Sequence, residues 1–142
     1  MPSRERILVV ANRTAESPEL LTELRERNAR RPVEVTLLVP ATWEVDDPHG
    51  GNQTARRRLR LALERMGQYD LEATGVVGDC DPLTALQEIW DPERFDDVIV
   101  CTLPSRLSVW LKRDLPRRAE RLCGRPVKHL VGTERRPTGV PA

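Results

Sequence analysis

No glycine occurs between Val98 and Arg118, in a part of the chain that otherwise favours a ligand-binding turn. An apolar strand here leads into a turn that carries serine and arginine, and a helix follows. α/β proteins usually bind ligands at such turns. The best-known nucleotide-binding loops need glycine there, because it lets backbone N–H groups approach a phosphate closely. A loop of that kind is excluded, whereas the serine and arginine side chains still indicate a pocket for an anion.

Cysteine and histidine are also scarce. Cys80, Cys101 and Cys123 are odd in number and have no C-x-x-C spacing, so with two histidines they suggest neither a disulfide framework nor a zinc site. His49 falls in a loop and His129 in the last strand, and no Ser-His-Asp spacing, G-x-S-x-G motif or H-E-x-x-H motif is present. We predict reduced thiols, no metal site and no catalytic residues, and the sequence favours a protein that is not an enzyme.

The chain has neither a strong net charge nor a long apolar run. Its 142 residues carry a formal charge of only +1, although 32% of them are charged. The overall field therefore favours neither nucleic acid nor an anionic membrane as a partner. No apolar run approaches the roughly 20 residues that span a bilayer, and the first residues lead into a strand rather than a secretory segment. We expect one soluble, cytoplasmic domain.

The sequence does contain a regular alternation of strand-like and helix-like segments. Apolar runs predict five strands, at Ile7–Ala11, Val33–Val39, Leu71–Val77, Asp97–Thr102 and Pro126–Val131. Helical patterns lie between them, and two begin with a capping residue followed by proline, Ser17-Pro18 and Asp81-Pro82. Right-handed crossovers then give a single-domain, doubly wound α/β fold with a five-stranded, mainly parallel sheet and helices on both faces. We expect this domain to cover residues 1–132, and residues 133–142 to form a loose tail.

In such a sheet the ligand crevice lies at the carboxyl ends of the strands, where strand order reverses. The residues expected to line it follow the first four strands: Ala11, Asn12, Arg13, Val39, Ala41, Gly78, Thr102, Ser105 and Arg106. Arg106 and Arg117 belong to a cationic group around the fourth turn, and guanidinium groups can replace backbone donors for a phosphate or carboxylate. A solvated helix face is the simpler interpretation of these arginines, as it is for Arg56, Arg57, Arg58 and Arg60.

Three features of the sequence resemble a known pattern that covers nearly the whole chain, from about Arg6 to Val131. They are the order of the elements, the Gly78-Asp-Cys-Asp-Pro-Leu entry into a helix, and the Asp97-Val-Ile-Val strand. On these features the chain resembles the universal stress protein (UspA-like) family. The resemblance implies an adenine nucleotide alpha hydrolase-like fold, a homodimer paired through the last strand, and a part in the stress response. For some members it also implies ATP, held by an acidic residue after the first strand and by a glycine-rich loop after the fourth.

Both of the family's ATP-binding features differ in this chain. Asn12 stands at the acidic position and supplies no carboxylate for a ribose or a metal ion. The glycine-rich loop is matched by Thr102, Ser105 and Pro116-Arg117, and none of its glycines is present. Because Pro116 has no N–H to offer a phosphate, ATP is not expected to bind in the family's way. The cofactor stays open, with ATP or another adenine nucleotide as a candidate that the motif does not support.

Three functions agree with these observations. The first is a non-catalytic binding or regulatory protein of the universal stress type, with a small anionic ligand. The second is a nucleotide-binding enzyme of the adenine nucleotide hydrolase-like class, in which Arg106 and Arg117 take the place of the glycine loop. The third is a structural, dimeric interaction module whose crevice is filled by its own side chains and whose last strand supplies the dimer edge.

Overall fold

The computed structural model describes residues 4–41 and 52–134. Strands and helices alternate along these residues as the sequence predicts. Their bounds are β1 (Glu5–Val10), α1 (Pro18–Arg30), β2 (Val33–Pro40), α2 (Asn52–Gln68), β3 (Glu72–Gly78), α3 (Pro82–Ile89), β4 (Asp97–Thr102), α4 (Val109–Lys112), α5 (Leu115–Cys123) and β5 (Lys128–Val131). None of the helices in these two ranges is long and apolar enough to cross a membrane.

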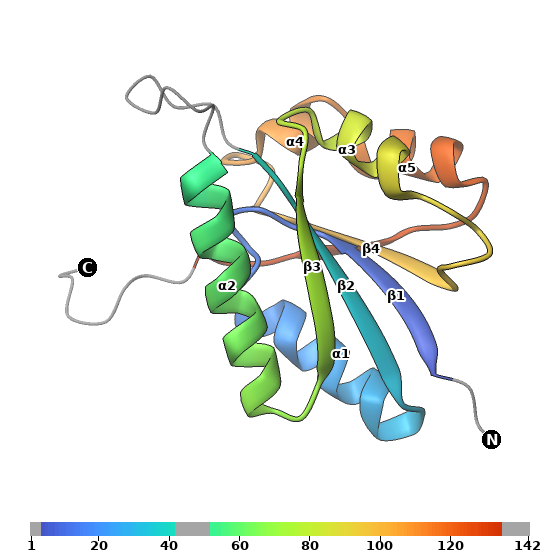
Figure 1. Ribbon diagram of the computed structural model, residues 1–142. Coiled ribbons are helices and arrows are strands. Elements are labelled where there is room, and N and C mark those ends of the chain that lie inside the picture. The colour runs from blue at the N-terminus through green and yellow to red at the C-terminus, as the bar shows by residue number, and fades with distance from the viewer. Residues whose placement is uncertain (1–3, 42–51, 135–142) are drawn as a thin grey trace, which may run out of the picture.

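The strands form one parallel sheet in the order β3-β2-β1-β4-β5 (Figure 1). The expected doubly wound α/β fold is therefore confirmed. Starting from β1, the chain first adds β2 and β3 on one side and then β4 and β5 on the other. Strand order reverses between β1 and β4, which is where sheets of this kind open a crevice for ligands.

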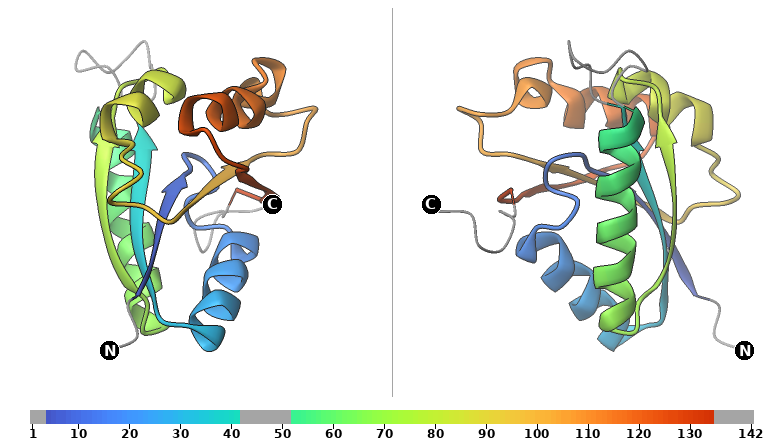
Figure 2. Two further views of the ribbon diagram at one scale, coloured as in Figure 1. Left: turned by 90° about the vertical axis from the view of Figure 1, so that its right-hand side faces the viewer. Right: turned by 60° about the vertical axis from the view of Figure 1, so that its left-hand side comes forward.

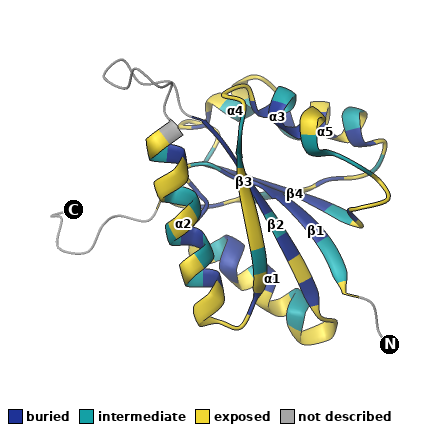
Figure 3. Ribbon diagram, in the orientation of Figure 1, coloured by how far each residue is buried: buried dark blue, intermediate teal, exposed yellow. Residues whose placement is uncertain are grey.

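Helices cover both faces of the sheet. α1 and α2 pack on one face, and α3 and α5 pack on the other (Figures 1 and 2). Successive side chains of β1 point to opposite faces, so Ile7 and Val9 enter one core cluster while Leu8 and Val10 enter the other. The central strands are mostly buried, whereas the edge strand β3 is largely exposed (Figure 3). The carboxyl ends of β1 and β4 thus belong to the buried centre of the sheet.

The two predicted helix starts are confirmed. Ser17 caps α1, where its hydroxyl accepts a hydrogen bond from the Leu20 N–H at 3.2 Å. Asp81 caps α3 in the same way, accepting from the Leu83 N–H at 3.4 Å. A proline follows each cap as the first helical residue, a position where its missing N–H costs nothing. Each of these helices follows a strand through a loop, so their caps lie towards the end of the sheet that carries the crevice.

The chain continues past β5 through Gly132, Thr133 and Glu134 and stays in contact with the domain there. The Gly132 N–H donates to the carbonyl oxygen of Thr102 at 2.8 Å, and Thr133 bonds to Glu19 of α1. The predicted loose tail begins at residue 133, and its residues 135–142 lie outside the described part of the chain. The division into a domain and a tail stays a prediction.

Candidate functional site

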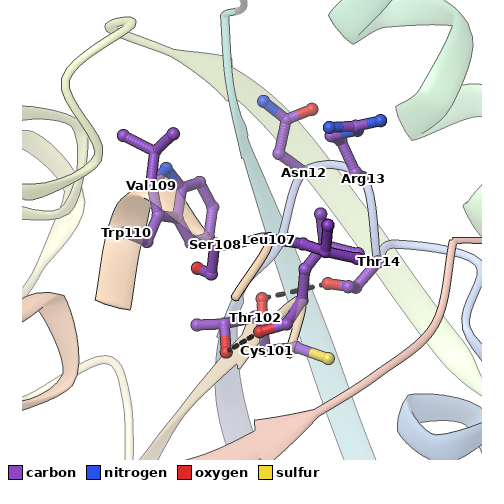
Figure 4. A pocket seen from close by; sticks show the side chains of 10 residues that line it. Asn12, Arg13, Thr14, Cys101, Thr102, Leu107, Ser108, Val109 and Trp110 are labelled. Atoms are coloured by element: carbon purple, nitrogen blue, oxygen red, sulfur yellow. Dashed lines mark hydrogen bonds between the residues drawn. The ribbon is translucent and has the colours of Figure 1, made fainter. Parts of the chain in front are cut away.

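A pocket of about 250 Å³ opens at the carboxyl ends of β1 and β4, which are neighbours in the middle of the sheet (Figure 4). Three stretches of chain form it: the loop after β1, the end of β4, and the segment that leads into α4. The lining residues are Asn12, Arg13, Thr14, Cys101, Thr102, Leu103, Leu107, Ser108, Val109 and Trp110. The pocket therefore occupies the point where strand order reverses.

The loop after β1 is tied to both neighbouring strands. The backbone N–H of Ala11 donates to the carbonyl oxygen of Leu38 in β2 at 3.1 Å. The hydroxyl of Thr14 donates to the carbonyl oxygen of Cys101 in β4 at 2.9 Å (Figure 4). Thr14 is buried, so this bond is shielded from water. The two bonds fix the backbone that presents Asn12 and Arg13 to the pocket.

The carboxamide of Asn12 is oriented by partners from β2 and α2. Its Nδ2 donates to the carbonyl oxygen of Pro40 at 3.3 Å, and its Oδ1 accepts from Nη1 of Arg58. Arg58 is half-buried here, although the sequence places it on a solvated helix face. The difference arises because α2 begins beside the carboxyl ends of the strands (Figure 1). A long side chain from its second turn therefore reaches the loop after β1. Arg58 thus helps to position a residue that lines the pocket.

Arg13 brings a positive charge to the pocket. Its Nε and Nη2 donate to the two carboxylate oxygens of Glu134, at 2.8 and 3.0 Å. These hydrogen bonds raise the pKa of the Arg13 guanidinium above its usual value. The Arg13 side chain is 53% exposed and that of Glu134 is 40% exposed, so water reaches the ion pair. A group entering from solvent can reach this guanidinium.

Thr102 closes the pocket at the end of β4. Its Oγ1 lies 3.0 Å from the carbonyl oxygen of Leu103 and 2.8 Å from Nε2 of His129 in β5. The hydroxyl has one proton and two neighbouring partners, and its role towards Nε2 depends on the tautomer of the imidazole. Burial lowers the pKa of His129, which favours the neutral form of the ring. The Thr102 hydroxyl is therefore engaged within the protein.

The rest of the wall is apolar and comes mainly from the segment between β4 and α4. Ser108 caps α4 by accepting a hydrogen bond from the Leu111 N–H at 3.1 Å, and this fixes the first turn of the helix. Leu107 and Val109 stay more than half exposed, whereas Trp110 packs partly against the core under α3 and α5. A largely apolar wall with a few placed polar groups is typical of small-molecule sites.

The structure brings three of the expected site residues into the pocket: Asn12, Arg13 and Thr102. The other seven do not line it. Ala11, Val39 and Ala41 are buried, and Ala41 pairs with Gly78 through a 2.9 Å backbone bond. Ser105 and Arg106 are exposed on the loop between β4 and α4, and Arg117 is exposed on α5. The binding roles of all ten residues stay predictions.

Seven lining residues are missing from the set that the sequence predicts. They are Thr14, Cys101, Leu103, Leu107, Ser108, Val109 and Trp110. Burial raises the pKa of the Cys101 thiol, which is free. One signal in the sequence was available, because Ser108 is a good N-cap and places Val109 and Trp110 on a helix start after the fourth strand. His49 lies outside the described residues.

No protein-family model matches the chain, and no curated protein matches it. Solved structures do. The chain is similar to the universal stress protein from Archaeoglobus fulgidus in complex with dAMP, with 13% identity, 91% of this chain and 98% of the other covered, and a TM-score of 0.63. For a universal stress protein in complex with cAMP the identity is 20%, the coverage 92% and 99%, and the TM-score 0.59. For a universal stress protein family protein from Arabidopsis thaliana with AMP bound, the identity is 11%, the coverage is 91% of this chain and 92% of the other, and the TM-score is 0.55.

These likenesses extend over almost the whole of each chain, and the sequence identities are low. They concern the arrangement of strands and helices, which is also the arrangement that the order of elements in the sequence predicts. The chain has the fold of the universal stress proteins.

Proposed function

We propose that the chain is a non-catalytic binding or regulatory protein of the universal stress type, and that its ligand is a small nucleotide with a single phosphate. The observation that carries the proposal is the pocket between β1 and β4, in which Arg13 and Asn12 lie on one side and Val109 and Trp110 on the other (Figure 4). An apolar wall suits a base, and a guanidinium suits a phosphate. One pocket thus offers both of the chemistries that a mononucleotide needs.

The size of the pocket favours a monophosphate over ATP. Its volume of about 250 Å³ lies just under the usual range for small-molecule sites, which is roughly 300–1,000 Å³. A triphosphate would also need several backbone donors close to its oxygens. The loop after β4 has no glycine and contains Pro104, which has no N–H. A ligand with one phosphate does not need a loop of this kind.

The similar structures support the same ligand class. Three of them are complexes with dAMP, cAMP and AMP, and each of these ligands carries one phosphate on an adenine nucleoside. Because this chain has the same fold and a pocket at its switch point, a nucleotide of that size is the natural candidate.

The hydrogen bonds around the pocket favour binding over catalysis. The hydroxyls of Thr14 and Thr102 donate to backbone carbonyls, and that of Ser108 accepts from a backbone N–H. A serine or threonine nucleophile needs instead a neighbouring base that takes its proton. Nε2 of His129 lies 2.8 Å from Oγ1 of Thr102, and the same hydroxyl has the carbonyl oxygen of Leu103 as a second partner at 3.0 Å, so its proton is shared with the backbone rather than directed to the imidazole alone.

The proposal also includes a homodimer paired through β5, a cytoplasmic location and a part in the stress response. β5 lies at the edge of the sheet, and its last residue, Val131, is 49% exposed. An edge strand offers unpaired backbone groups that a second copy of the chain can use.

Calorimetric titration with AMP, cAMP and ATP tests the ligand, and a pair of matched variants tests the place where it binds. Val109→Glu puts a carboxylate on an exposed residue of the pocket wall, and Val76→Glu puts the same group on the exposed face of β3. We expect saturable AMP binding by the native protein. Repulsion of the phosphate in Val109→Glu should weaken it about tenfold, while Val76→Glu keeps the native affinity.

Two results would contradict the proposal. Equal loss of affinity in both variants would place the nucleotide elsewhere, and no binding of any of the three nucleotides would favour the structural interaction module. Release of phosphate from ATP by the native protein with magnesium, abolished in Arg106→Ala, would favour the enzyme instead.

A further inference from the structure

The residues after β5 follow a path that several contacts fix. Gly132 donates its N–H to the carbonyl oxygen of Thr102 at 2.8 Å and packs closely against Ser17 and Cys101. The N–H and the hydroxyl of Thr133 then bond to the carboxylate of Glu19 in the first turn of α1, at distances of 3.3 and 3.4 Å. This path carries the chain across the carboxyl end of β4 and leaves Glu134 beside the loop that follows β1.

Glu134 meets Arg13 with both carboxylate oxygens. Nε of Arg13 donates to Oε2 and Nη2 donates to Oε1, at 2.8 and 3.0 Å. Two parallel N–H···O bonds are the arrangement in which a guanidinium binds a carboxylate or a phosphate. Arg13 lines the pocket, so a carboxylate of the chain holds the guanidinium that an anionic ligand would use.

We infer that Glu134 is an internal competitor for the anionic group of the ligand, and that the phosphate of a bound nucleotide takes over Arg13 from it. The inference rests on the proposed function. Glu134 acts on that pocket as a specificity residue: it opposes anionic ligands and leaves neutral ones unaffected. Binding of a phosphate also breaks the contact between Glu134 and Arg13, so occupancy of the pocket is coupled to the segment that follows β5.

The exposure of the pair sets the size of the effect. Side chains that are 53% and 40% exposed form a solvated ion pair, and exposed pairs contribute little to stability. A phosphate carries more charge than the carboxylate and has further oxygens to bond, so it can displace Glu134. Removing the competitor should therefore tighten binding of a phosphate ligand by about fivefold. A neutral ligand does not need Arg13 and should gain nothing.

The test uses the full chain, AMP, and adenosine as its uncharged counterpart, with calorimetry at low salt. Glu134→Gln removes the charge and keeps the shape of the side chain. Glu88→Gln on the exposed face of α3 changes the net charge equally and does not touch the pocket. We expect AMP to bind about fivefold more tightly to Glu134→Gln, with adenosine unchanged and with Glu88→Gln the same as the native protein.

Two further variants, Arg13→Gln and Arg13→Gln combined with Glu134→Gln, test whether Glu134 acts through Arg13. If Glu134 competes through Arg13, the gain disappears when Arg13 is absent. Equal AMP affinity in the native protein and Glu134→Gln, or an equal gain in Glu88→Gln, overturns the inference while leaving the proposed function intact. If AMP and adenosine bind to neither the native protein nor Glu134→Gln, both the inference and the proposed function fail.

Discussion

Gly132 is the residue through which the end of the chain is packed against the site. A Cβ at this position would lie 2.7 Å from Oγ of Ser17, 3.0 Å from Cβ of Ser17 and 3.1 Å from Sγ of Cys101. The nearest of these atoms belongs to the hydroxyl that caps α1. We expect Gly132→Ala to lower the free energy of unfolding by about 1–3 kcal/mol, because the added methyl group overpacks the site and disturbs the cap. Urea denaturation followed by circular dichroism measures the change.

Substitution of Gly67 provides a control in which the free energy of unfolding is expected to rise rather than fall. Gly67 lies near the end of α2, where a methyl group on its Cα would meet no neighbouring side chain or strand within 4 Å, and its backbone does not require glycine. Gly67→Ala should raise the free energy of unfolding by about 0.5–1 kcal/mol, since alanine is the better helix residue. A loss of stability in Gly67→Ala would contradict the open surroundings of Gly67, and an unchanged stability in Gly132→Ala would contradict the close packing of Gly132.

The site as a whole depends on side chains from remote parts of the sequence. Arg58 of α2 reaches Asn12, and Glu134 reaches Arg13 across 121 residues. Neither partner stands out in the sequence, because a charged residue on a helix or near a chain end is usually solvated. Asn12, Arg13 and Thr102 could be predicted because they lie at the carboxyl ends of the two strands at the switch point. Their partners depend on how the helices and the last segment pack, which periodicity does not determine.

At the level of elements, a cluster of charges joins α1 to β1 and β4 at the end of the sheet away from the pocket. Nε of Arg27 bonds to Glu23 at 2.7 Å, and Nη1 lies 2.5 Å from Asp97 and 3.4 Å from Glu5. Burial alone would lower the pKa of Arg27, but its hydrogen bonds to Asp97 and Glu23 outweigh this and raise the pKa. The side chain is only 12% exposed, so these interactions are stronger than those of a surface pair.

We expect Arg27→Met to lower the free energy of unfolding by about 2 kcal/mol. Methionine keeps the apolar part of the side chain and removes the guanidinium, which leaves carboxylates close together without their cation. Arg30→Met, an exposed position in the same last turn of α1, should change stability by less than about 0.5 kcal/mol. Thermal and urea denaturation of both variants provides the comparison, and equal stabilities would contradict a structural role for the cluster.

The elements themselves were the most predictable part of the fold. Ser17-Pro18 and Asp81-Pro82 start α1 and α3 where the capping pattern predicts, and the five strands agree with the expected ranges to within about two residues. Such features are local, because a cap or an apolar run depends on neighbouring residues. The pocket wall at α4 was harder to predict, because this helix has only four residues. Leu107, which precedes it, and Val109, its first residue, are exposed and form no regular apolar face.

For the whole molecule, the reversal of winding at β1 explains why the pocket and the exposed edge strand β5 are close together. β4 lines the pocket through Cys101 and Thr102, and the same residues pair with Leu130 and Val131 of β5. The hydrogen bond between Thr102 and His129 joins the two strands a second time. A change at the free edge of β5 is therefore only one strand away from the pocket.

The predicted homodimer can be tested at this edge. β5 has only four residues, and Val131 at its end is an exposed apolar side chain. Pairing of β5 with a second copy would satisfy its free backbone groups and cover Val131.

We expect sedimentation equilibrium to give a dimer for the native protein. Val131→Lys should shift it towards monomer, because each lysine would be brought close to its symmetry mate. Val76→Lys, on the opposite edge strand β3, should leave the dimer unchanged. A native protein that sediments as a monomer, or a dimer that Val76→Lys disrupts while Val131→Lys does not, would mean that the chain does not pair through β5.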